Sequence, residues 1–271
     1  MIFKNTEKSV TVAAVMSFLI SFLLVRFGGF SVSVVVNLQN HIVKSMIIDT
    51  AGMGTIGSIS AVSGHFIPLF VSMIFFTLSI SILAYYGYNN SNKTVGRSVG
   101  VISAIFAIVL FPSVSGVFFA LAVMVCSVYS QQFANTYGKE LKRWVFFRTG
   151  SNTAGKMMLL ANIIVSLGVF FAVLYQQPVY ETSFRQELTD SMMSIALYMP
   201  GASSIPLDTL NQRIESVIAS SPLFTGYIRW LPVTTAFSVF VLLELLRNII
   251  LANLSGLFTY VMLRTSNKSK G

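Results

Sequence analysis

The chain has 271 residues, of which 54% are hydrophobic and 10% are charged. Soluble domains carry about 25% charged residues, so this composition excludes an ordinary water-soluble domain and favours an integral membrane protein. The formal net charge is +9, but the basic residues lie beside apolar segments instead of forming one stripe, which argues against nucleic-acid binding.

The first predicted element is a membrane-spanning helix near residues 9–30. Ser9–Val25 carries no charged side chain, and a span needs about 20 residues. The helix is therefore extended past Arg26, whose long side chain can reach the membrane surface. Lys4 and Lys8 precede it as in a signal peptide, but no small-residue cleavage motif follows, so an uncleaved anchor is predicted.

Residues 31–64 are predicted as an amphipathic segment on the outer leaflet, because apolar residues recur there near helical spacing. Gly52–Gly57 matches GxGxxG, but no strand pattern precedes it, which favours a loop or tight helix packing over a nucleotide site. His41 and His65 are the only histidines and Cys126 is the only cysteine. They provide neither a metal ligand set nor a CxxC motif, so no metal or cofactor is predicted.

Three further membrane helices are predicted in the middle of the chain. Residues 66–86 form an uncharged stretch of spanning length. Residues 98–130 are also uncharged, but as one helix they would be about 50 Å long, which is too long for one crossing. Pro112 divides this stretch into helices near 98–111 and 114–130. They form either a hairpin of two short helices or a re-entrant pair.

Residues 131–156 are predicted as a basic cytoplasmic loop. The candidate patch within it mixes basic and aromatic side chains: Lys139, Lys142, Arg143, Trp144 and Arg148. Such a mixture is typical of a surface that binds anionic lipid headgroups at the cytoplasmic face. The alternative is a docking site for an acidic cytoplasmic partner.

A span near residues 157–175 leads into an extracytoplasmic helical pair at 176–229. Capping-box spacing places the starts of the two helices at Ser183 and Thr209. Each helix has one apolar stripe: Phe184, Leu188, Met192 and Ile195 in the first, and Leu210, Ile214, Val217 and Ile218 in the second. This cap is too small for an independent core, so we expect it to pack on the bundle rim or on protein partners.

Residues 230–271 are predicted as a C-terminal transmembrane helix with a basic cytoplasmic tail. Glu244 and Arg247 are the candidate intramembrane charge pair, since residues three apart share a helix face. Ionisable residues inside a membrane are functional candidates. Their depth in the inner third of the membrane favours structural pairing, and a water-filled cavity beside Glu244 would favour transport. A bend is predicted at Asn253–Gly256.

The distribution of basic residues sets the predicted orientation. Twelve lie on one side of the alternating spans and five on the other, and the richer side is assigned to the cytoplasm. The first set is Lys4, Lys8, Lys93, Arg97, Lys139, Lys142, Arg143, Arg148, Lys156, Arg264, Lys268 and Lys270, and the second is Arg26, Lys44, Arg185, Arg213 and Arg229. Both termini are then cytoplasmic.

The sequence thus predicts an all-α integral membrane protein of the cell membrane, with about six transmembrane helices and a small helical extracytoplasmic cap. The favoured function is a non-enzymatic subunit or scaffold of a membrane complex, in contact with the lipid bilayer and without nucleic acid. The alternative is a small-solute or ion transporter or channel that uses the Glu244/Arg247 pair. An intramembrane enzyme is disfavoured, because the acids, bases and metal ligands that it would need are few.

Overall fold

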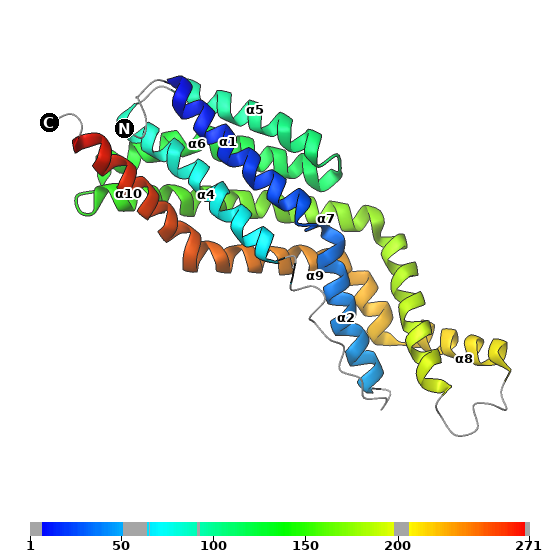
Figure 1. Ribbon diagram of the computed structural model, residues 1–271. Helices are drawn as coiled ribbons and strands as arrows, with labels where there is room; N and C mark the ends of the chain where they lie inside the picture. Colours follow the sequence, from blue (N-terminus) through cyan, green and yellow to red (C-terminus); the bar gives the residue numbers. More distant parts are fainter. Residues whose placement is uncertain (1–6, 51–63, 65, 91–92, 198–205, 269–271) are drawn as a thin grey trace. The chain divides into compact units, whose positions relative to one another are not determined.

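The computed structural model describes residues 7–50, 64, 66–90, 93–197 and 206–268 (Figure 1). Helices contain 93% of the described residues, and none of these residues is in a strand. The elements are α1 (Glu7–Phe27), α2 (Val32–Thr50), α4 (Phe66–Asn89), α5 (Thr94–Leu110), α6 (Val114–Glu140), α7 (Val145–Ala196), α8 (Leu207–Ser220), α9 (Pro222–Leu246), the π-helical turn η2 (Arg247–Leu251) and α10 (Ala252–Lys268). The prediction of an all-α chain is confirmed.

Among the described residues, five stretches of continuous helix are long and apolar enough to cross a membrane. They are α1, α4, α6, α7 and the helix that runs from α9 through η2 into α10. α5 is apolar but shorter, with 17 residues. These lengths and compositions are consistent with an integral membrane protein.

The chain divides into two compact units. Among the described residues, the first unit comprises 7–30, 64, 66–90, 93–169 and 237–268, and the second comprises 31–50, 170–197 and 206–236. α7 and α9 each contribute residues to both units.

Hydroxyl groups and aromatic rings join α1 to α4 in the first unit. Ser21 Oγ and Ser72 Oγ are hydrogen-bonded at 2.9 Å, and Ser79 Oγ donates to the carbonyl oxygen of Ala14 at 2.9 Å. Phe18 packs edge-on against Phe76, with 5.1 Å between ring centroids. Small hydroxyl residues let two helices approach closely in an apolar medium while their polar groups stay hydrogen-bonded.

One end of the first unit gathers the start of α1, the end of α4, the start of α5 and the connection from α6 to α7 (Figure 1). Tyr86, near the end of α4, donates to Glu7 at the start of α1 at 3.2 Å. Tyr88 packs edge-on against Phe146 at the start of α7, with 5.5 Å between centroids. Helices that follow one another within this unit therefore run in alternating directions.

α5 and α6 form an antiparallel hairpin around Pro112. Ser113 caps α6, because its Oγ accepts a hydrogen bond from the amide of Gly116 at 3.1 Å. The predicted end of the second helix at residue 130 is wrong, since α6 continues to Glu140. The residues beyond Ser130 bond to neighbouring helices: Gln131 Oε1 accepts from the amide of Gly96 at 2.8 Å. α6 is therefore long and apolar enough to cross a membrane.

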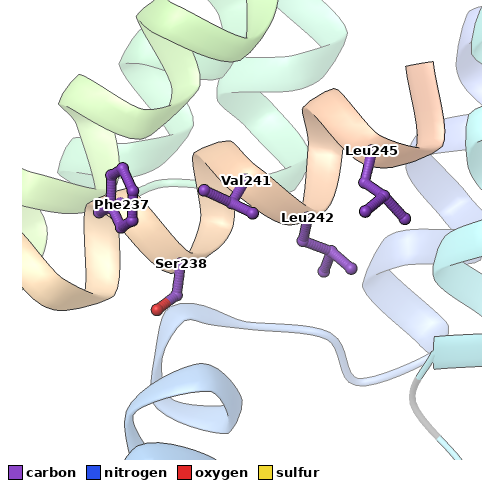
Figure 2. Close-up of a pocket in the computed structure, with 5 residues that line it drawn as sticks. All are labelled: Phe237, Ser238, Val241, Leu242 and Leu245. Carbon is purple, nitrogen blue, oxygen red and sulfur yellow. The ribbon is translucent and has the colours of Figure 1, made fainter. Parts of the chain in front are cut away.

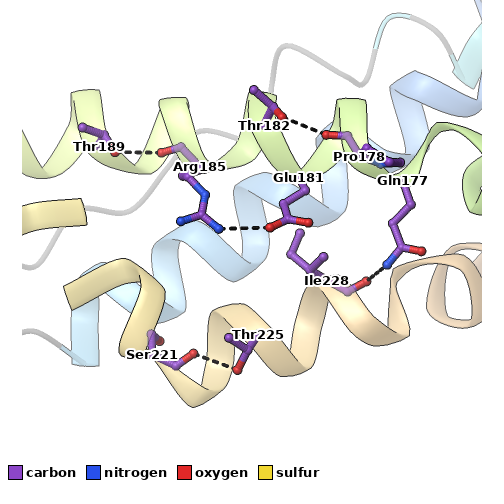
Figure 3. A network of polar contacts seen from close by, with 9 residues as sticks. All are labelled: Gln177, Pro178, Glu181, Thr182, Arg185, Thr189, Ser221, Thr225 and Ile228. Atoms are coloured by element: carbon purple, nitrogen blue, oxygen red, sulfur yellow. Dashed lines mark hydrogen bonds and ion pairs between the residues drawn. The ribbon is translucent and has the colours of Figure 1, made fainter. Parts of the chain in front are cut away.

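The predicted loop 131–156 is mostly helical. Only residues 141–144 connect α6 to α7, which begins at Val145. α7 has 52 residues and continues through Pro178, so the predicted helix start at Ser183 is also wrong. Pro178 removes one backbone donor, but its carbonyl oxygen still accepts from Thr182 Oγ1 at 2.9 Å (Figure 3). The loss of one hydrogen bond does not end the helix here.

The C-terminal helix begins at Pro222 and not near residue 230. Proline suits the first helical position, because its fixed φ matches the helix and its missing N–H is not needed there. The predicted bend at Asn253–Gly256 is replaced by the η2 turn at Arg247–Leu251. Figure 1 shows that the chain changes direction between the end of α9 and α10.

The second unit has its own apolar core. The buried residues in it are Ile47, Phe184, Leu188, Met192, Ile214, Ile218, Phe224 and Ile228. Most of the two predicted stripes is therefore buried, but Val217 is 54% exposed. Ile47 comes from α2, so α2 and the helices of the predicted cap, which were predicted as separate outer elements, share one core.

Polar contacts also tie α2, α7 and α9 together in the second unit. Tyr227 donates to Asn40 Oδ1 at 2.7 Å, and Gln177 Nε2 donates to the carbonyl oxygen of Ile228 at 2.7 Å (Figure 3). Arg185 pairs with Glu181 at 3.0 Å. The predicted capping role of Thr209 is wrong, because α8 begins at Leu207 without a side-chain cap.

Candidate functional site

Glu244 and Arg247 form an ion pair at the junction of α9 and η2. Glu244 Oε2 lies 2.5 Å from an Nη atom of Arg247, and the two side chains are 15% and 16% exposed. The sequence placed the two residues on one helix face, and the structure brings their charged groups into direct contact. Buried charges need such pairing, because their removal from water is otherwise costly.

α7 supplies the remaining partners of this pair. Asn162 Nδ2 donates to Glu244 Oε1 at 2.7 Å, and the other Nη atom of Arg247 donates to the carbonyl oxygen of Gly155 at 2.7 Å. Positions 155 and 162 are two helical turns apart and lie on one face of α7. We define these four residues as the charge cluster. It links α9 and η2 to α7.

Sequence reasoning missed Asn162 and Gly155. A signal for Asn162 was present, because it is the only side-chain amide in the apolar stretch 157–175. A buried amide inside such a stretch needs a hydrogen-bond partner. The role of Gly155 had no signal in the sequence, since only its backbone oxygen takes part.

The charge cluster uses both oxygens of the carboxylate within the chain. Arg247 Nε is buried and has no hydrogen-bond partner among the described residues. In a medium of low dielectric constant, such a network strengthens every hydrogen bond in it and penalises the loss of any one partner. The arrangement can hold two helices together. It also places the Glu244 carboxylate in a partly buried position, where its attraction to a proton or cation is stronger than in water.

The π-helical turn begins at Arg247 itself. The amide of Ala252 donates to the carbonyl oxygen of Arg247, which is the five-residue spacing of a π-helix. Such turns often occur at functional sites, because they interrupt the regular backbone pattern. The charge cluster and the interruption therefore coincide.

The basic and aromatic candidates gather around the α6–α7 connection. Lys139 is in the last turn of α6, Lys142 to Trp144 lie in the connection, and Arg148 is in the first turn of α7. All five side chains are exposed. Trp144 is 77% exposed and has a φ of 53°. We name residues 139–148 the basic turn.

The other candidates do not assemble into a site. No group of three or more His, Cys, Asp or Glu side chains able to hold a metal occurs among the described residues. Cys126 is buried and its Sγ donates to the carbonyl oxygen of Met157 at 3.2 Å, as expected of a packing residue. Gly52–Gly57 and His65 lie outside the described residues.

Comparison of the chain with profiles of known protein families, with curated proteins and with solved structures finds no match. The features from which a function can be inferred are therefore the charge cluster, the basic turn and the exposed apolar helix faces.

Proposed function

We propose that this chain is a non-enzymatic multi-pass membrane protein that acts as a subunit or scaffold of a membrane complex. The observation that carries this proposal is the exposure of the last span. Only 17% of its most apolar 18-residue stretch is buried, against 33–44% for the other four spans. A helix that packs so little within its own chain has a large surface left for another helix.

The exposed surface lies on α9. Phe237, Ser238, Val241, Leu242 and Leu245 line an open groove of about 380 Å³ (Figure 2). Phe237 and Leu245 are 65% and 54% exposed. The occupant that we propose is an apolar transmembrane helix of another subunit, because ridges of one helix fit the grooves between side chains of another.

In this proposal the charge cluster has a structural role. Two hydrogen bonds fix α9 and η2 to α7, and the ion pair within α9 and η2 holds the two charged groups in place. Polar contacts between membrane helices hold a bundle in one arrangement. The face of α9 that carries the groove is then presented in a fixed orientation to the partner.

We assign six crossings to the chain: α1, α4, α5, α6, the first part of α7, and α9 with α10. The second unit is the extracytoplasmic cap, and both termini are cytoplasmic in the cell membrane. This orientation is supported by basic residues at the end of the first unit where α1 begins and α4 and α6 end. Among the described residues they are Lys8, Lys93, Arg97, Lys139, Lys142, Arg143 and Arg148. An excess of Lys and Arg is characteristic of cytoplasmic connections.

Position-specific crosslinking tests the partner surface. A photoreactive phenylalanine analogue at position 237 is expected to give one discrete adduct with a second protein in native membranes. The same analogue at position 105 is the control, since Ile105 on α5 is similarly exposed, at 57% against 65% for Phe237. The partner should also co-purify in stoichiometric amounts in mild detergent.

Alanine substitutions at positions 237 and 105 distinguish a specific interface from non-specific contact between membrane proteins. Phe237→Ala is expected to reduce recovery of the partner, and Ile105→Ala is expected to leave it unchanged. Equal adducts at both positions, or lipid adducts alone, would contradict the proposed interface.

A transporter or channel is the second candidate function. It is favoured by the coincidence of the Glu244/Arg247 pair with the π-helical interruption of the span. Interrupted helices line ion and substrate sites in many transporters. In this alternative, Glu244 exchanges a proton or binds a cation, and the η2 turn allows the helix to move.

Flux measurements decide between the two functions. If the alternative holds, proteoliposomes of the purified chain should carry H⁺, Na⁺ or K⁺, reported by a trapped pH- or cation-sensitive dye. Glu244→Gln should abolish this flux while keeping the hydrogen bond to Asn162, although its thermal stability falls because Arg247 loses its counter-charge. No flux above that of empty liposomes, or equal flux in the variant, would remove Glu244 from a transport mechanism.

A further inference from the structure

The basic turn concentrates positive charge on a short exposed connection. Lys139, Lys142, Arg143 and Arg148 are exposed, and Glu140 is the one acid among residues 139–148. None of the four cations takes part in an ion pair among the described residues. Four positive charges against one negative are therefore available to an external anion.

Trp144 adds an exposed aromatic ring to these charges. Its φ of 53° lies in the left-handed region, which is strained for a bulky residue. Residues with such backbone strain cluster at active sites, ligand-binding sites and switch regions. Tryptophan, with an apolar body and one N–H donor, is enriched where membrane meets water.

The turn lies within reach of the headgroup layer. α6 carries no charged residue before Lys139. With the edge of the hydrocarbon core placed at Ser130, the ten residues from there to Glu140 add about 15 Å of helix. Headgroups occupy about 5–8 Å outside the hydrocarbon core on each side. The remaining 7–10 Å is comparable to the Debye length of about 8 Å at physiological salt. Extended Lys, Arg and Trp side chains cover the same distance.

A second connection at this end carries charges of the same sign. Lys93 and Arg97 are exposed near the start of α5, and the end of α4 contacts the basic turn through Tyr88 and Phe146. This end of the first unit thus presents a broad positive surface and not a closed pocket. A flat layer of anionic phosphates matches it better than one folded acidic domain does.

We propose that the basic turn binds anionic phospholipid headgroups, with Lys142, Arg143 and Arg148 contacting phosphates and Trp144 inserted at the interface. Each basic residue near an anionic membrane contributes about 1 kcal/mol of attraction, or about a fivefold gain in association. This interaction is independent of the partner helix on α9, so either can fail without the other.

Fluorescence of Trp144 tests the proposal directly, because the chain has only two tryptophans. The full-length Trp230→Phe variant is placed in nanodiscs of phosphatidylcholine, with and without 30 mol% phosphatidylserine. The anionic lipid is expected to shift Trp144 emission to shorter wavelength and to reduce quenching by acrylamide. High salt should reverse both changes, because the attraction is electrostatic.

Two variants serve as controls. Trp144→Phe leaves Trp230 as the reporter, and its emission should not respond to the anionic lipid. Lys142→Gln/Arg143→Gln, made in the Trp230→Phe background, removes two exposed charges. It should lower the apparent affinity for phosphatidylserine about 25-fold, measured by varying the phosphatidylserine content of the nanodiscs, with unchanged thermal stability.

Three outcomes would overturn the proposal. Trp144 emission could be the same in both nanodiscs, or the response could survive removal of the two charges. The third is shielding of Trp144 in native membranes but not in anionic nanodiscs, which would identify an acidic protein as the ligand instead.

Discussion

Arg247→Met is expected to destabilise the folded chain by about 3–5 kcal/mol, because the Glu244 carboxylate would be left buried without its cation. In the wild-type chain the two charges are 2.5 Å apart, and neither side chain is more than 16% exposed. The hydrogen bond from Asn162 would remain, but one neutral amide does not offset a buried charge. Thermal unfolding in detergent measures the loss.

A double variant provides the decisive comparison. Glu244→Leu/Arg247→Met removes both charges and is expected to be far more stable than Arg247→Met alone, since replacing a whole buried pair by apolar residues is often neutral. A double variant as unstable as the single one would mean that the pair itself is needed for folding. Equal stability of all three chains would mean that the pair is solvated and contributes nothing.

Gly87→Ala is expected to destabilise the contact between α4 and α6 by about 1–3 kcal/mol. A Cβ at position 87 would lie 2.5 Å from the carbonyl oxygen and 2.6 Å from the Cα atom of Gln131. These are backbone atoms and cannot rotate away, so the two helices must separate. Loss of thermal stability and of a monodisperse chromatographic peak would report the separation.

Gly155→Ala is the matched control for this substitution. Position 155 is also within a helix, but a Cβ there meets nothing within 4 Å. Its carbonyl oxygen remains available to Arg247. Both substitutions gain about 1 kcal/mol of helix propensity, so their difference isolates the steric clash. Equal stabilities would show that α4 and α6 are not in contact at this position.

Hydropathy was sufficient to predict the helical class and most of the helices of membrane length. Long uncharged stretches leave little choice, because only a helix satisfies its own backbone in an apolar medium. The break at Pro112 was predictable for a related reason: proline lacks the donor that a continuous helix needs. These signals are local and can be read from one segment at a time.

Helix ends that depend on other segments were not predictable. Gln131 looked like the start of a loop, but its side chain bonds to the amide of Gly96, 35 residues earlier. Ser183 looked like the start of a new helix, but α7 continues from Val145 to Ala196 without a break. A polar residue does not mark a helix end when a distant segment supplies its hydrogen-bond partner, and one segment alone does not reveal such a partner.

Two of the four residues of the charge cluster were predictable from the sequence. The spacing of Glu244 and Arg247 was sufficient to place them on one face, because it follows from helix geometry. Their partners on α7 depend on which two helices pack together, and the sequence carries no direct record of that. The core shared by α2, α7, α8 and α9 was missed for the same reason.

The π-helical turn at Arg247–Leu251 sets the rotational phase of α10. One additional residue per turn offsets everything after it by about 100° relative to an uninterrupted α-helix. In the phase that results, Ser255 bonds to Ser81 at 2.8 Å and to the carbonyl oxygen of Gly150 at 3.2 Å. Substitutions at residues 247–251 should therefore be tolerated better than insertions or deletions there. Deletion of one residue would rotate Ser255 and Thr259 out of contact with α7.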